Sequence, residues 1–201
     1  MISISADIAA AERMLSNIAR TQLPFATALA LNDTAADVKA REERSLGEDL
    51  DGPTPFTKRG LFVRRASKRK LTATVGVKDI QAGYLKYQVK GGTRTPKGRA
   101  IPVPVSLRLN KYGNMPRGTL GRLGAKKGTF ATSPGKRGTR HLAPGIYQRG
   151  RKGAVKMLVA FEPRAQYKPK WSFVSHAERT ARAGFQGHFI TRLRQALATL
   201  R

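Results

Sequence analysis

The chain has 201 residues, of which 40% are hydrophobic, and this length and composition allow a folded core. Its formal net charge of +27 and isoelectric point near 11.5 lie far from those of ordinary enzymes, because self-repulsion on this scale opposes compaction unless an anionic partner compensates it. The absence of cysteine excludes disulfides and thiolate metal sites.

The beginning of the chain shows no targeting signal. Residues 1–20, MISISADIAAAERMLSNIAR, lack a basic region followed by an apolar stretch, and no segment approaches the roughly 20 apolar residues that a membrane span needs. We therefore expect a soluble protein that is made in the cytoplasm.

Charge is distributed unevenly along the chain. Residues 1–57 contain nine acidic and five basic residues, whereas residues 58–201 contain three acidic and thirty-four basic residues. Between Asp79 and Glu162 there are eighteen Lys and Arg and no carboxylate. One hypothesis is that, in a homo-oligomer, the acidic end of one subunit lies against the basic part of the next, a head-to-tail contact of the kind that closes rings.

Residues 1–50 are expected to form helices. A first helix is predicted by apolar residues at helical spacing, which are Ile8, Ala11, Leu15 and Ile18. Pro24 suits the first turn of a second helix, which is predicted to end near Leu46, where Gly47 offers a C-cap. Acidic residues, glycine and prolines between 49 and 55 then break the pattern.

Residues 56–90 are expected to form the strands of a core. LFVRRA (61–66) and LTATVGV (71–77) flank the four residues SKRK, which predicts a hairpin with a cationic tip. YLKYQV (84–89) alternates in the same way and is predicted as a third strand. A fourth strand is predicted at 154–162, the most apolar run in the chain.

Residues 91–153 have little periodicity. They contain thirteen of the twenty glycines and six prolines, and the prolines of IPVPV (101–105) are compatible only with an edge or extended segment. Because so long an irregular segment is unusual inside a compact domain, we expect a basic extended arm that a partner orders.

Residues 154–201 are expected to supply the fourth strand and a C-terminal helix. Ser175 and Glu178 form a capping-box pattern, and apolar residues follow at steps of three and four. The resulting fold class is α+β: a small antiparallel sheet flanked by a long N-terminal helix and a C-terminal helix, with a long basic arm or loop rich in glycine and proline.

The sequence predicts no enzyme, metal site or cofactor. Its three histidines, His141, His176 and His188, are too scattered for a metal cluster. GTFATSPGKRG (128–138) resembles a phosphate loop but has Phe130 where the Walker pattern needs glycine, and Arg137 where it needs Ser or Thr. The basic part of the chain offers no pair of carboxylates for acid and base roles.

The candidate contact residues are therefore cations. Evenly spaced Lys and Arg between glycines suit a segment that lies along phosphates, although the same segment would also suit an acidic protein surface, and at the hairpin tip simple solvation is an equal alternative. Aromatic residues are too sparse to indicate that the chain recognises a specific base sequence. The candidates are Lys68, Arg69, Lys70, Arg94, Lys97, Arg99, Lys111, Arg117, Lys126, Lys127, Lys136, Arg137 and Arg140.

Five segments follow one another along roughly residues 24–173 of the chain. They are PFATALALNDTAADVKAREERSL, PTPFTKRGLFVRRASKRKLTATVGVKD, YLKYQVKGGTR, KYGNMPRG and PGIYQRGRKGAVKMLVAFEPRAQYKPKW. The most specific feature is YQVKGGTR followed by YGNMPRG. In this order the segments resemble the minor tail protein Z, or tail completion, family of tailed bacteriophages.

This resemblance implies a structural virion protein at the tail or the head–tail junction. It implies a homo-oligomeric ring, hexameric or dodecameric, around the channel that DNA traverses, with tail, neck or portal proteins as neighbours and DNA as a further possible contact. It implies no catalytic residues, and it makes KYGNMPRG and GGTRTPKGR contact loops between subunits or with partners. The alternative from the residues alone is a basic nucleic-acid-binding protein, ribosomal-like or DNA-packaging, that acts through phosphate contacts.

Overall fold

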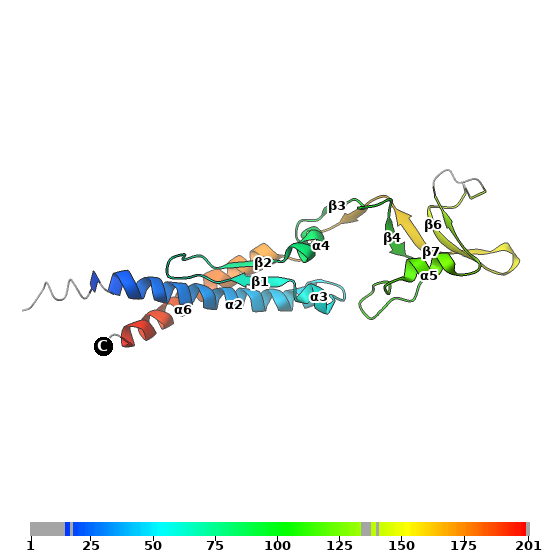
Figure 1. Ribbon diagram of the computed structural model, residues 1–201. Helices are drawn as coiled ribbons and strands as arrows, with labels where there is room; N and C mark the ends of the chain where they lie inside the picture. Colours follow the sequence, from blue (N-terminus) through cyan, green and yellow to red (C-terminus); the bar gives the residue numbers. More distant parts are fainter. Residues whose placement is uncertain (1–14, 17, 134–137, 140, 200–201) are drawn as a thin grey trace, which may run out of the picture. The chain divides into compact units, whose positions relative to one another are not determined.

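The computed structural model describes residues 15–199 except 17, 134–137 and 140 (Figure 1). It is a mixed α+β fold with a long N-terminal helix, small antiparallel sheets and a C-terminal helix, which confirms the predicted class. The chain divides into two compact units. The helical unit comprises the described parts of Met1–Glu48, Pro55–Gly83 and Ser172–Arg201, and the sheet unit comprises Asp49–Thr54 and Tyr84–Trp171.

The N-terminal helix α2 (Leu23–Asp49) follows a π-helical turn, η1 (Ile18–Gln22). Its 27 residues correspond to about 40 Å at 1.5 Å per residue. Small side chains on its inner face, among them Ala26, Ala30 and Ala35, are buried and permit close packing. The helix passes through Gly47, the predicted C-cap, and the left-handed glycine comes later, at Gly52 with φ of 62°. Most of the predicted first helix lies outside the described residues.

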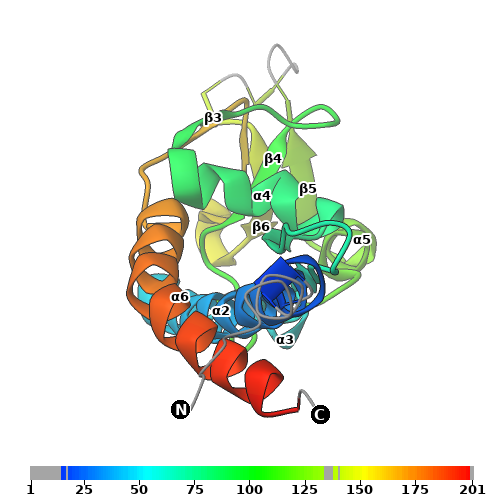
Figure 2. The same cartoon turned by 90° about the vertical axis from the view of Figure 1, so that its left-hand side faces the viewer.

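Helix α6 (Phe173–Ala198) runs antiparallel to α2 in the helical unit (Figure 2). Its partly buried positions recur every three or four residues, which is the amphipathic pattern that the sequence predicts, and Phe185 stacks on Phe189 at 6.0 Å between ring centres. The predicted capping box is wrong, because the helix begins at Phe173. Ser175 lies in the first turn and donates to the Ser172 carbonyl at 3.1 Å.

The predicted hairpin is present in the helical unit. β1 (Leu61–Arg64) pairs antiparallel with β2 (Thr74–Val77), and the short helix α3 (Pro55–Lys58) precedes it. The side chain of Asn32 in α2 exchanges two hydrogen bonds with the backbone of Ala66, at 2.7 and 3.1 Å. These two hydrogen bonds hold the chain just beyond β1 against α2.

The predicted third strand is wrong, because residues 84–89 lie in helix α4 (Asp79–Lys90). Gln81 and Leu85, four residues apart, are both buried, as one face of a helix requires. Gly91 adopts φ of 69° and donates its N–H to the Tyr87 carbonyl at 3.0 Å, which ends the helix. The alternation of apolar residues at 85, 87 and 89 is compatible with a strand. A glycine directly after Lys90, however, is typical of the end of a helix.

The sheet unit contains a four-stranded antiparallel sheet in the order β4-β7-β6-β5. Its elements are β4 (Ile101–Pro104), α5 (Thr119–Ala125), β5 (Thr129–Thr132), β6 (Gly145–Arg149), a 3₁₀ turn η2 (Arg151–Gly153) and β7 (Val155–Glu162). The core is formed by Leu123, Ile146, Leu158 and Val159. The edge position of β4 confirms the prediction from IPVPV, since proline cannot donate to a ladder.

The predicted extended arm, residues 91–153, is instead largely built into this unit. It supplies β4, α5, β5 and β6, together with β3 (Gly92–Arg94), which pairs antiparallel with β8 (Ala165–Tyr167). Each strand has only three to five residues, so its alternation is too short to stand out among glycines and prolines. Long-range pairing with β7 and β8 orders these segments.

Candidate functional site

The sheet unit carries most of the positive charge of the chain. Residues 84–171 contain twenty-one Lys and Arg and one carboxylate, Glu162, and the segment 49–54 adds Asp49 and Asp51. Among the described residues of this unit, only Lys170 lies within ion-pair distance of a carboxylate, with Nζ 2.7 Å from Asp51. The hydrogen bond from Lys170 lowers the pKa of Asp51. The other described cations of this unit have no carboxylate of a described residue within ion-pair distance.

Four acidic residues of α2, in contrast, have basic partners inside the helical unit. The pairs are Asp33–Arg192 at 2.6 Å, Asp37–His188 at 2.7 Å, Glu43–Lys39 at 2.8 Å and Glu48–Arg41 at 3.0 Å. The hydrogen bond from Arg192 holds the pKa of Asp33 below its usual value, against a smaller opposing effect of burial. A head-to-tail contact between this acidic helix and the basic part of a neighbouring subunit would have to displace these partners.

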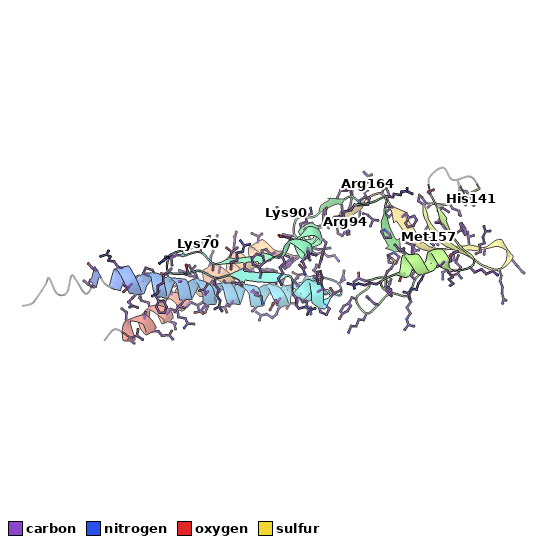
Figure 3. All side chains as sticks on the ribbon, in the orientation of Figure 1. Lys70, Lys90, Arg94, His141, Met157 and Arg164 are labelled. Carbon is purple, nitrogen blue, oxygen red and sulfur yellow. The ribbon has the colours of Figure 1, made fainter. Side chains whose placement is uncertain are left out.

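The predicted contact residues at 68–70 lie at the exposed hairpin tip of the helical unit (Figure 3). Ser67 and Lys70 exchange backbone hydrogen bonds at 2.9 and 3.1 Å, so Lys68 and Arg69 occupy the turn itself. The Lys68 ammonium lies 4.6 Å from the centre of the Phe25 ring in α2. The tip is thus a defined turn in which Lys68 already has an aromatic neighbour.

Three further predicted residues lie on or after the β3–β8 ribbon. Arg94 ends β3 opposite Ala165, and Lys97 and Arg99 follow in the loop to β4, all three exposed. Arg164, which is not one of the predicted contact residues, precedes β8, and Figure 3 shows it on the same ribbon as Arg94. The ribbon gathers cations from two distant parts of the sequence.

The loop that contains KYGNMPRG is closed by Asn110. Its side-chain oxygen accepts the N–H groups of Tyr112 and Asn114, each at 3.0 Å, and its backbone N–H donates to the Asn114 carbonyl at 2.9 Å. Gly113 has φ of 72°, which the turn requires. Lys111 is presented from this turn and Arg117 follows it, both exposed. The loop is an ordered turn that displays cations, and its docking role remains a prediction.

Lys126 and Lys127 follow α5 and are exposed. Lys136, Arg137 and Arg140 lie outside the described residues. Three further cations lie near the turn that contains Lys126 and Lys127 and were not predicted as contact residues. Arg149 ends β6, and Arg151 and Lys152 lie in the turn between β6 and β7. The signal was present, since the glycines of QRGRKGAV separate two apolar runs in the manner of a hairpin. The proximity of the two turns depends on pairing across the sheet.

A serine, a histidine and a glutamate also meet in the helical unit. Ser45 Oγ lies 3.1 Å from His176 Nδ1, and Glu42 Oε1 lies 4.0 Å from the same nitrogen. A hydrolytic triad needs the hydroxyl and the carboxylate on opposite ring nitrogens. Ser45 and Glu42 are also fully buried. This arrangement fits a polar contact that joins α2 to α6 and does not fit a nucleophile with its base.

No protein-family model matches the chain, and neither a curated protein nor a solved structure is significantly similar to it. None of the helices among the described residues is both long and apolar enough to cross a membrane.

Proposed function

We propose that this chain is a structural subunit of a bacteriophage tail or neck, which joins neighbouring virion proteins in the head–tail assembly without catalysis. The order of the sequence segments that resemble the tail completion family supports this proposal. The partners are other tail, neck or portal proteins, and the place of action is the tail or the head–tail junction of the virion.

The observation that carries the assembly role is the separation of charge between the two units. The carboxylates of α2 named above have basic partners in the helical unit, whereas among the described residues of the sheet unit one cation, Lys170, has an acidic partner. The exposed cations of the sheet unit are therefore available to anionic groups of other molecules. Charge complementarity of this kind steers association and fixes register between partners.

The assembly that we propose is a homo-oligomeric ring, hexameric or dodecameric. The test is to purify the protein at high salt with nuclease, transfer it to low salt, and examine it by sedimentation velocity and negative-stain microscopy. We expect closed rings whose absorbance ratio at 260 and 280 nm is that of pure protein. A protein that stays monomeric at every concentration and salt would contradict a ring that forms without other virion proteins.

A second candidate function is a nucleic-acid-binding protein that acts through phosphate contacts. The exposed cations of the sheet unit without carboxylate partners favour it. When purified at low salt without nuclease, this protein would be monomeric and would carry nucleic acid. It would release the nucleic acid steeply as salt rises, because each phosphate contact adds close to one unit to the log–log slope.

A further inference from the structure

Two turns of the sheet unit lie side by side at one end of the four-stranded sheet. Residues 126–128 join α5 to β5, and residues 150–154 join β6 to β7 (Figure 1). The Arg149 N–H donates to the Gly128 carbonyl at 2.8 Å, which holds the turns together. We call the two turns, with Arg149, the basic turn pair. Its cations are all exposed: Lys126, Lys127, Arg149, Arg151 and Lys152.

The basic turn pair presents its cations from a defined frame. In the second turn, Gly150 donates to the Ala154 carbonyl at 2.7 Å and Ala154 donates to the Arg151 carbonyl at 3.2 Å. The Arg149 guanidinium lies 4.9 Å from the centre of the Phe130 ring, which limits its motion. Since the backbone of the turn is already hydrogen-bonded, less conformational freedom is lost when a ligand binds.

Lys152 occupies a strained backbone conformation. Its φ of 54° lies in the left-handed region, and it is the one non-glycine residue with positive φ in the described part of the chain. A Cβ atom is unfavourable there, so glycine would relieve the strain. Strained residues concentrate at functional sites, and here the position carries a cation.

We propose that the basic turn pair binds the phosphodiester backbone of nucleic acid without reading its sequence. Protein–nucleic acid interfaces are much more positive than protein–protein interfaces, whose centres are depleted of charge and enriched in aromatic and apolar residues. None of the five cations lies within ion-pair distance of a carboxylate among the described residues, and Val155 is the exposed large apolar side chain next to them. This inference rests on the proposed function, because it identifies nucleic acid as the anionic partner that the positive charge of the sheet unit binds.

The test measures binding of the full-length protein to a labelled random-sequence DNA duplex by fluorescence anisotropy over a range of salt. The test variant is Lys126→Gln, Lys127→Gln and Arg151→Gln together. The matched control removes three exposed charges elsewhere in the same unit, two in α4 and one just after β8: Lys86→Gln, Lys90→Gln and Lys168→Gln. We expect the test variant to bind roughly tenfold or more weakly, with its log–log salt slope reduced by about two to three units, and the control to bind nearly as the parent does.

Equal losses of duplex affinity in both triple variants would show that binding depends only on the net charge of the sheet unit. That result would overturn the basic turn pair as a binding site. Poly-glutamate of matched charge is the second probe. If it binds as tightly as the duplex and is weakened equally by the test variant, the partner class is an acidic polypeptide and the inference fails. Either failure leaves ring formation in the nuclease-treated protein unaffected, so failure of the site and of the proposed function are distinguishable.

Lys152→Gly separates binding from folding. Because glycine relieves the strained φ, we expect this variant to unfold at a higher temperature than the parent, and because it removes a cation, we expect weaker duplex binding with the salt slope reduced by about one unit. A variant that is more stable and binds the duplex with unchanged affinity and slope would exclude Lys152 from the site.

Discussion

Arg192 of α6 donates two hydrogen bonds to the carboxylate of Asp33 in α2, from Nε at 2.6 Å and from Nη2 at 3.0 Å. This is a fork-to-carboxylate contact, and it joins residues that are 159 positions apart in the sequence. One turn later in α2 and one turn earlier in α6, the side chains of Asp37 and His188 approach to 2.7 Å. Together the two pairs fix the register of the C-terminal helix on the N-terminal helix.

Replacement of Arg192 should destabilise the helical unit. Arg192→Ala should lower the urea midpoint of unfolding, and Arg192→Lys should recover only part of the loss, because an ammonium group cannot reproduce the two-point contact. The control is Arg182→Ala on the same helix, where the side chain is 84% exposed and lies 3.8 Å from Glu178; it should leave the midpoint unchanged. Equal effects of Arg192→Ala and Arg182→Ala would argue against the contact.

The same contact predicts a dependence of stability on pH. The hydrogen bond from Arg192 makes the pKa of Asp33 lower in the folded protein than its usual 3.8. The stabilisation is therefore present above the unfolded pKa and is lost as pH falls through the folded value. The difference in urea midpoint between the parent and Asp33→Asn should be constant from about pH 5 to 7 and should shrink below about pH 4. A constant difference down to about pH 2 would contradict this assignment.

Gly145 should not tolerate a side chain. A Cβ at this position would meet the carbonyl oxygen of Val159 well inside van der Waals contact, and that oxygen belongs to the backbone of β7, which cannot move aside as a side chain can. Gly145→Ala should cost about 1–3 kcal/mol or more. Gly121 in α5 is the control, because a Cβ there meets nothing within 4 Å. Gly121→Ala should stabilise the unit by about 0.5–1 kcal/mol, which chemical denaturation of both variants would measure.

Asn110 should be the residue that closes the loop containing KYGNMPRG. Asn110→Ala removes the acceptor of two backbone N–H groups, those of Tyr112 and Asn114, and should cost about 1 kcal/mol because the groups remain partly accessible to water. Amide hydrogen exchange should become faster at both residues. Asn110→Asp, which keeps the acceptor, is the control and should preserve their protection. Unchanged exchange in Asn110→Ala would show that the turn is held by other contacts.

The type of a local element could not always be predicted from its own residues. For α4, Asp79 in the first turn, Lys90 in the last turn and Gly91 after it indicate a helix, yet the alternation of Leu85 with its neighbours favoured a strand. The two patterns share the same apolar residues, and burial of Gln81 on the same face decides between them.

Several features could be predicted from the amino-acid sequence alone: the long N-terminal helix, the cationic hairpin, the edge position of the strand with Pro102 and Pro104, the amphipathic C-terminal helix and the excess of positive charge. These features depend on periodicity, on the missing N–H of proline and on composition, which are local or additive properties. Other features became clear only from the three-dimensional fold: the described residues of 91–153 belong to the sheet unit, Asp33 and Asp37 of α2 have partners in α6, and the turns after α5 and β6 lie side by side. Each of these depends on pairing between residues far apart in the chain, and short strands carry too little local pattern to specify their partners.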